Sequence, residues 1–240
     1  MRPALLSVAG RYASHLSWLY QDADATDKAL YWADRTADFA HAAGWRQMAA
    51  YALARKGNIL QTGQPCHAAA LARAATRNTR LSASLTAYIS AQEAEAHAHA
   101  GEARAAHQAL DVARRAADQA TPDEPLPTPQ MISITDMVRY GQASVDLKLG
   151  QPESAIAALE PVRAECSAPR SFAHYTPPLA LAYPRAGDVD AACRTAMEIA
   201  QRGTRCASAT ARRGLRAVRQ SLQPWADRPD VHDVIHALSA

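Results

Sequence analysis

Four glycines in equivalent positions constrain the fold of this chain more than any other feature of its sequence. Gly63, Gly101, Gly150 and Gly187 each follow one alanine-rich helical pattern and precede another. The positions five, nine and twelve residues after each glycine hold the apolar residues Ala68, Ala72, Ala75, Ala106, Leu110, Ala113, Ala155, Leu159, Val162, Ala192, Ala196 and Ile199. This spacing places them on one face of a helix that begins just after the glycine.

Each glycine is expected to end the first helix of a pair as a left-handed C-cap residue. A small residue seven positions earlier would then let the two helices pack closely. The residues found there are Lys56, Ala94, Ala143 and Ala180. Asp24 takes the place of the glycine in a further unit, with Ser17 behind it and Ala29 and Ala33 ahead.

The units recur at intervals of 39, 38, 49 and 37 residues, somewhat longer than the roughly 34 residues of a tetratricopeptide repeat. We therefore predict an all-α fold, a tetratricopeptide-like α-solenoid of about five helical hairpins plus a C-terminal capping helix pair. The predicted helices cover 4–22, 25–43, 46–62, 65–77, 80–100, 103–119, 131–149, 152–165, 171–186, 189–202, 206–222 and 229–239.

A proline-rich segment, 121–130, accounts for the longest interval between units. Its four prolines are incompatible with a helix interior, so we predict a stiff, exposed connection there. It would separate N-terminal hairpins in 1–120 from C-terminal hairpins and the cap in 131–240.

Composition agrees with close-packed helices. Alanine, the strongest helix former, supplies 57 of the 240 residues, whereas there are only 10 glycines and 2 phenylalanines. The net charge of +3 is too small to indicate nucleic-acid binding by itself. No apolar run is long enough to span a membrane, and we expect a cytoplasmic protein. The cysteines Cys66, Cys166, Cys193 and Cys206 lack the spacing of a zinc site.

Residues 4–120 carry a family resemblance. The segments that carry it are Arg11-Tyr12-Ala13, Trp18-Leu19-Tyr20-Gln21-Asp22, Ala29-Leu30-Tyr31-Trp32-Ala33-Asp34-Arg35 and Ala40-His41-Ala42-Ala43-Gly44. They resemble the tetratricopeptide-like C-terminal region of actinomycete-type, Xre-like helix-turn-helix transcriptional regulators. The resemblance implies a regulatory or scaffolding role and no catalytic residue. It also implies that DNA would be bound only through a separate helix-turn-helix domain, which this sequence does not contain.

Two carboxylate–histidine pairs near residue 95 are the best candidates for chemistry. Glu93 and His97 share one helical face, as do Glu95 and His99, and His107 could join them from the next helix. Such pairs could bind zinc or act as a base with its orienting group. The interpretation we favour is a solvated helix end, where histidine interacts favourably with the helix dipole.

Known catalytic patterns are absent from the sequence. It has no G-x-S-x-G motif and no glycine-rich nucleotide loop. We therefore predict a protein that is not an enzyme and has no metal or cofactor. A helical enzyme or metal protein using Glu95 and His99 is the alternative.

Arginines are concentrated between Arg202 and Arg219, where there are six of them and no acidic residue. Arg212, Arg216 and Arg219 fall on one helical face. This basic patch could contact phosphates or an acidic partner, or it could simply be the solvated face of a capping helix.

The groove of tetratricopeptide repeats is lined from fixed positions before the turn glycine. Counting back in this chain gives the polar and aromatic candidates Trp18, Gln21, Tyr88, Glu95, His99, Tyr140, Ser144 and Lys148. Such a mixed set is suited to a peptide, a protein or a small ligand. We therefore predict an interaction or sensor module that is regulatory in role and could form a homodimer. Alternatively, Trp18 and Tyr140 pack between hairpins.

Overall fold

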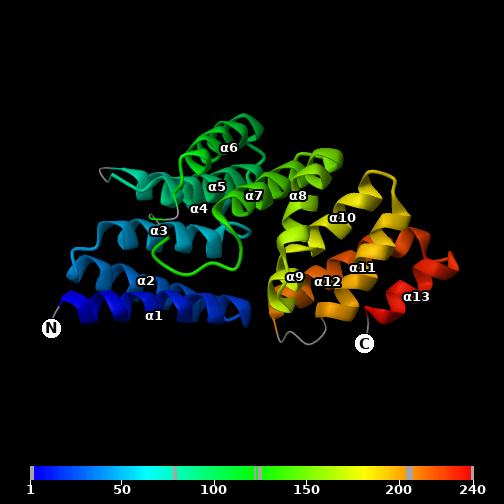
Figure 1. Cartoon of the computed structure of the whole chain (residues 1–240), viewed down its shortest axis with the longest axis horizontal. Coiled ribbons are helices and arrows are strands. Elements are labelled where there is room, and N and C mark those ends of the chain that lie inside the picture. Colours follow the sequence, from blue (N-terminus) through cyan, green and yellow to red (C-terminus); the bar gives the residue numbers. More distant parts are fainter. Residues whose placement is uncertain (1–2, 78–79, 122, 124–125, 204–207, 239–240) are drawn as a thin grey trace. The chain divides into compact units, whose positions relative to one another are not determined.

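The computed structural model describes residues 3–77, 80–121, 123, 126–203 and 208–238. These residues form helices, turns and loops with no β-strand (Figure 1), so the all-α prediction is confirmed for the described chain. The chain divides into two compact units, Met1–Leu149 and Gly150–Ala240, here called the first and the second unit.

The first unit contains α1 (Pro3–Asp22), α2 (Thr26–Ala42), α3 (Arg46–Leu60), α4 (Pro65–Thr76), α5 (Ala83–His99), α6 (Ala103–Asp118) and α7 (Ile134–Lys148). Each of these helices packs against the next one in the chain. In addition, α1 contacts α3, α3 contacts α5, and α5 contacts α7. We call these four the A helices, because each of the first three is the first helix of a hairpin.

The spacing predicted from the glycines matches the structure closely. Every residue at the three apolar positions after a turn is buried, from Ala29 in α2 to Ile199 in the second unit. Gly101, Gly150 and Gly187 have φ angles of 77°, 75° and 85°. Asp24, the residue predicted to replace a glycine, also adopts a left-handed conformation, with φ at 58°. The predicted left-handed turns are therefore confirmed at these four positions.

The second hairpin departs from this pattern. Gly63 does not have a positive φ, and α3 ends at Leu60, which lengthens the turn before α4. The close approach is made by Gly57, where a Cβ atom would lie 3.1 Å from the carbonyl oxygen of Ala68. The prediction at Lys56 is wrong, because the different turn shifts the helix register by one residue. The Lys56 Nζ instead lies 2.7 Å from Asp34 Oδ1.

Of the described residues in the proline-rich segment, Thr121, Asp123, Pro129 and Gln130 are exposed as predicted, whereas 126–128 are at least partly buried. Pro127 is buried, and Leu126 and Ile132 pack against the hydrophobic core of the first unit. The boundary between the compact units lies after Leu149, later than the division expected at 121–130. The reason is that α7 packs against α5 and α6 and so joins the first unit. This boundary falls between the two helices expected to form the fourth hairpin.

The second unit contains α8 (Pro152–Glu165), α9 (Pro169–Tyr175), α10 (Pro177–Arg185), α11 (Val189–Gly203), α12 (Ala209–Leu222), a 3-10 turn (Gln223–Trp225) and α13 (Pro229–Ala237). The helix predicted over 171–186 is two helices, because Pro177 and Pro178 have no N–H to donate to the preceding turn. Helices α8, α11 and α12 all pack against α10, and α13 packs against α11 and α12. Among the described residues of the second unit, Phe172 is the largest fully buried side chain.

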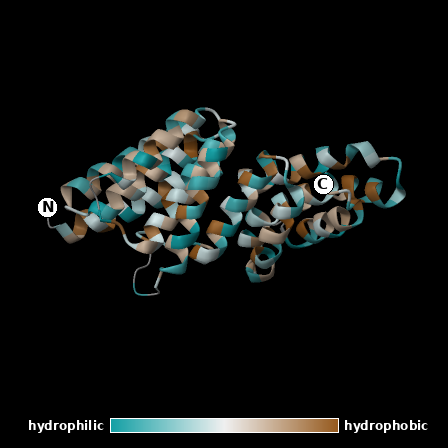
Figure 2. Cartoon of the chain, turned by 90° about the horizontal axis from the view of Figure 1, so that it is seen from above, coloured by the Kyte–Doolittle hydropathy of each residue, from teal (hydrophilic) through white to brown (hydrophobic). Residues whose placement is uncertain are grey.

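Hydrophobic and hydrophilic residues alternate along the helices of both units (Figure 2). This is the pattern of amphipathic helices that bury one face. The A helices depart from it most clearly in α5, where thirteen of the seventeen residues are buried, including Gln92, Glu95 and His97. Buried polar side chains need partners, and their partners define the candidate site.

Candidate functional site

A chain of polar side chains crosses the four A helices. Gln21 Nε2 in α1 donates to Asn58 Oδ1 in α3 at 3.1 Å, and Asn58 Nδ2 donates to Gln92 Oε1 in α5 at 2.5 Å. Gln92 and Gln61 then donate to the two carboxylate oxygens of Glu95, at 3.4 and 3.5 Å. We call the set Gln21, Arg55, Asn58, Gln61, Gln92, Glu95 and Ser144 the polar ladder.

Glu95 is the titratable centre of the polar ladder. Its side chain is only 5% exposed, and Ser144 in α7 also hydrogen-bonds to its carboxyl group. Burial raises the pKa of Glu95 to about 7, against the opposing effect of the hydrogen bonds from Ser144 and Gln61. The carboxyl group therefore changes charge near neutral pH.

Arg55 carries a positive charge into the same region. It is 4% exposed, and its Nη1 donates to Asn58 Oδ1 at 2.9 Å. Its Nε and Nη2 atoms are buried and have no hydrogen-bond partner among the described residues. A buried guanidinium group with unused donors costs free energy. The polar ladder thus contains hydrogen-bonding capacity that the described side chains do not use.

The opposite ends of the A helices are apolar. Tyr51 and Tyr88 stack with their ring centroids 5.2 Å apart, and Met137 belongs to the same cluster. Residues 126–132, here called the strap, lie against this cluster through Leu126 and Ile132. The A helices therefore present a polar half near their C-terminal ends and an apolar half near their N-terminal ends.

A cavity of about 570 Å³ lies beside the strap. Its walls come from Arg11 in α1, Ser84 in α5, residues 120–121 after α6, the strap, and Ile134 at the start of α7. The Arg11 guanidinium group also lies over the Trp45 ring, 5.1 Å from its centroid. A hollow of this size lies within the range of small-molecule and peptide side-chain sites.

The structure brings together some of the predicted groove residues. Gln21, Glu95 and Ser144 belong to the polar ladder, and Tyr88 belongs to the apolar half. His99 lies near the exposed Lys148. Burial of His99 and the positive charge of Lys148 both lower the pKa of His99.

The two remaining groove candidates lie outside the polar ladder. Trp18 is partly buried and stacks on His15 with a centroid separation of 6.0 Å. Tyr140 is partly buried in α7. Their exposed portions leave both side chains able to contact a ligand.

Four ladder residues, Arg55, Asn58, Gln61 and Gln92, were not among the sequence candidates. The count back from Gly63 gave neighbouring positions in α3, because the turn of the second hairpin differs from the others. The available signal was the presence of Arg55 and Asn58 three residues apart on an otherwise alanine-rich helix. Gln92 has no comparable signal, since its role depends on which residue of α3 faces it.

The two carboxylate–histidine pairs lie in different surroundings. His97 Nδ1 lies 2.5 Å from Glu102 Oε2, and its Nε2 lies 3.6 Å from Glu93 Oε1. Glu95 instead contacts α3 and α7, while the exposed His107 bonds to the carbonyl of Ala103. Within the described chain, no three histidine, cysteine or carboxylate side chains are grouped as a metal site. Glu95 and His99 therefore form no common centre with His107.

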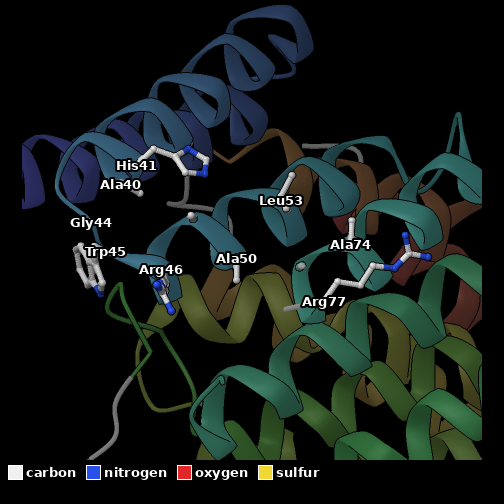
Figure 3. Close-up of a pocket in the computed structure, with 11 residues that line it drawn as sticks. Ala40, His41, Gly44, Trp45, Arg46, Ala50, Leu53, Ala74 and Arg77 are labelled. Atoms are coloured by element: carbon white, nitrogen blue, oxygen red, sulfur yellow. The ribbon is translucent and has the colours of Figure 1, made fainter. Parts of the chain in front are cut away.

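A second hollow, of about 390 Å³, lies between α2, α3 and α4 (Figure 3). His41, Arg46 and Arg77 stand around it, with Trp45 and Leu53 on its walls. His41 is in the last turn of α2 and Arg77 is the C-cap residue of α4. Cations at helix C-termini are favourable in themselves, so these two positions are accounted for without a ligand.

The basic patch of the second unit is smaller than the sequence suggested. Arg212 and Arg216 are exposed on α12, and Arg219 is partly buried. Arg202 pairs with Glu198 at 2.9 Å and stacks over Phe172. Arg205 lies outside the described residues. The patch therefore consists mainly of side chains on one helix.

No protein-family model matches the sequence, and no curated protein is significantly similar to it. Among the helices that the structure describes, none combines the length and the apolar character needed to cross a lipid bilayer.

Proposed function

We propose that the A helices of the first unit bind an extended peptide segment, and that the chain acts as a regulatory interaction module of the tetratricopeptide type. The packing of the strap on the A helices is the observation that supports this proposal most strongly. The strap is a non-helical segment of the chain whose Leu126 and Ile132 already pack on the aromatic cluster of the A helices. A surface that already holds apolar side chains of one non-helical segment has the chemistry to hold those of another segment beside it.

The two halves of the A helices suggest the character of that peptide. An apolar side chain would enter the cavity beside the strap, where Arg11 supplies a positive charge for an acidic neighbour. Polar residues further along would reach the exposed parts of Gln21, His99 and Lys148. The expected ligand is therefore an amphipathic segment with at least one acidic residue. The alternative ligand is a small apolar acid, which would fill only the cavity beside the strap.

A regulatory role rests on the resemblance of residues 4–120 to the C-terminal regions of Xre-like regulators. In such an arrangement, the module would receive the signal and a separate domain would bind DNA. The polar ladder contains buried ionisable side chains and lies beside the proposed binding surface. Binding of a ligand there could change the free-energy cost of burying Glu95 and Arg55, as a sensor requires.

Selection of a random peptide library on the full-length chain tests the proposal. We expect the selected peptides to converge on a pattern of apolar and acidic residues. A synthetic peptide of that pattern, measured by fluorescence anisotropy, should bind at least about tenfold more weakly to the Arg11→Ala, Lys148→Ala double variant. The matched control is the Arg212→Ala, Arg216→Ala double variant, which removes two exposed cations from the second unit.

Two results would contradict the proposal. One is a library that yields no convergent sequence. The other is a peptide whose affinity falls in the Arg212→Ala, Arg216→Ala control while remaining unchanged in the Arg11→Ala, Lys148→Ala variant. If an apolar acid bound and no peptide did, the cavity would still be the binding site, but the assignment of a peptide ligand would be wrong.

A further inference from the structure

Helix α1 exposes an apolar stripe that the packing of the first unit does not use. Leu5, Val8, Tyr12 and Leu19 are 59%, 50%, 69% and 39% exposed, and Leu16 is partly exposed on the same side. The buried residues of α1, namely Gly10, Ala13, Ser14, Ser17 and Asp22, lie elsewhere on the helix. Large exposed apolar side chains gathered on one face indicate an interaction surface.

The stripe is narrow and its spacing is symmetric. Its members follow one another at intervals of three, four, four and three residues. At about 100° per residue they fall within an arc of about 80°. The intervals read the same in both chain directions, with Tyr12 at the centre. A surface with this property can pair with a copy of itself across a two-fold axis.

We propose that two copies of this chain associate through antiparallel α1 helices, with the two-fold axis at Tyr12. In this arrangement Leu5 faces Leu19 of the second copy, and Val8 faces Leu16. Tyr12 of each copy packs against the other. The five side chains then form one continuous apolar seam of the kind that holds antiparallel helices together.

The charges around α1 agree with a second copy as the occupant. Arg11 is the only arginine, lysine or acidic residue between Pro3 and Gln21. Its guanidinium group is directed at the Trp45 ring, so the pairing places no like charges face to face across the seam. Interfaces are typically depleted of charge at their centre and enriched in aromatic residues such as Tyr12. Apart from Arg11, which is directed away to Trp45, this stretch offers a strongly charged partner no lysine, arginine or acidic side chain.

The dimer should be weak, because one pair of helices is a small interface. Sedimentation velocity of the full chain, from low to several hundred micromolar, should show the sedimentation coefficient rising with concentration. Tyr12→Glu places two carboxylates at the axis and should raise the dimer dissociation constant at least about tenfold. The matched control is Tyr31→Glu, because Tyr31 is 55% exposed on α2 and lies outside the stripe.

Cysteine cross-linking tests the geometry separately. In a Cys66→Ser background, Tyr12→Cys should form a disulfide-linked dimer on mild oxidation, because the axis brings the two residues 12 together. Val8→Cys alone should not, whereas a mixture of Val8→Cys and Leu16→Cys chains should. The Cys66→Ser parent supplies the blank.

A chain that stays monomeric at all concentrations overturns the proposal, and so does a dimer that survives Tyr12→Glu or dissociates with Tyr31→Glu. Circular dichroism of each variant confirms that its helices are intact. Cross-linking of Val8→Cys to itself, in place of Leu16→Cys, would contradict the antiparallel register.

Discussion

The two units bury different kinds of side chain. In the first unit the buried polar residues include long, ionisable or amide side chains, among them Arg55, Gln92, Glu95 and His97. In the second unit the buried polar residues among those described are the short hydroxyl-bearing Ser171, Thr176, Thr195 and Ser208. Short hydroxyl groups can bond to their own helix backbone, whereas long polar groups must find partners on other helices.

The charged groups of the second unit are paired more completely, although Thr176 Oγ1 there is buried without a hydrogen-bond partner among the described residues. Arg163 and Arg202 both reach Glu198, and the Arg202 guanidinium group lies 3.7 Å from the centre of the Phe172 ring. Arg55 in the first unit retains two unused buried donors. Local violations of good packing concentrate at functional sites. The difference is what we expect if the second unit mainly contributes stability and the proposed binding surface lies in the first unit.

The largest expected effect comes from the core of the second unit. Phe172→Ala should reduce the free energy of unfolding by about 3–5 kcal/mol, since Phe172 is fully buried and supports Arg202. Urea unfolding followed by circular dichroism measures this loss. A loss below about 1 kcal/mol would mean that the second unit does not depend on large apolar side chains.

The pH dependence of the first unit should be set in large part by Glu95. Its pKa rises from 4.5 to about 7 on folding. Its stabilising contribution is therefore fully present below about pH 4.5 and is lost as the pH rises through about 7. At about pH 8 the Glu95→Gln variant should be more stable than the wild type by up to about 3 kcal/mol.

Urea unfolding at several pH values tests this difference. The advantage of Glu95→Gln should shrink toward zero as the pH falls to about 4.5. The matched control is Glu153→Gln in α8, which removes an exposed carboxylate from the second unit and should not reproduce the gain in stability at about pH 8. A difference between Glu95→Gln and wild type that does not vary with pH would contradict the burial of an ionisable Glu95.

Replacing glycine by alanine at close helix contacts tests how tightly helices pack in each unit. Gly57→Ala would place a Cβ atom 3.1 Å from a backbone oxygen, and Gly214→Ala would place one 2.8 Å from the Pro177 ring. Each should destabilise the chain by about 1–2 kcal/mol despite the better helix propensity of alanine. Gly10→Ala has 3.6 Å to its nearest neighbour and should stabilise by up to about 1 kcal/mol.

Thermal unfolding ranks the three glycine variants. If Gly57→Ala raised the melting temperature as Gly10→Ala is expected to do, the close approach of α3 to α4 would be wrong. If Gly214→Ala raised it, the contact of α12 with α10 would be wrong.

The smallest effect is expected at the basic patch of the second unit. Because both side chains are exposed, the Arg212→Ala, Arg216→Ala variant should change the free energy of unfolding by less than about 0.5 kcal/mol. Any DNA binding by the wild-type chain should be weak and should disappear as salt rises. A salt-tolerant complex with one DNA sequence, lost in this variant, would assign a binding function to the second unit.

Helix positions were largely predictable from the sequence because each hairpin repeats the same local spacing. The clearest case is Asp24, whose left-handed conformation followed from its place among the glycines. Side-chain partners across the A helices were not predictable in the same way. Asn58 and Gln92 lie 34 residues apart and meet through the packing of α3 against α5. The strap likewise packs back through long-range contacts that its prolines do not specify.

Hydrogen–deuterium exchange of the full chain, with and without a library-selected peptide, tests the central claim most directly. The account predicts that the peptide slows exchange in the A helices α1, α3, α5 and α7 and leaves residues 150–240 unchanged. Slower exchange confined to residues 150–240 would contradict it.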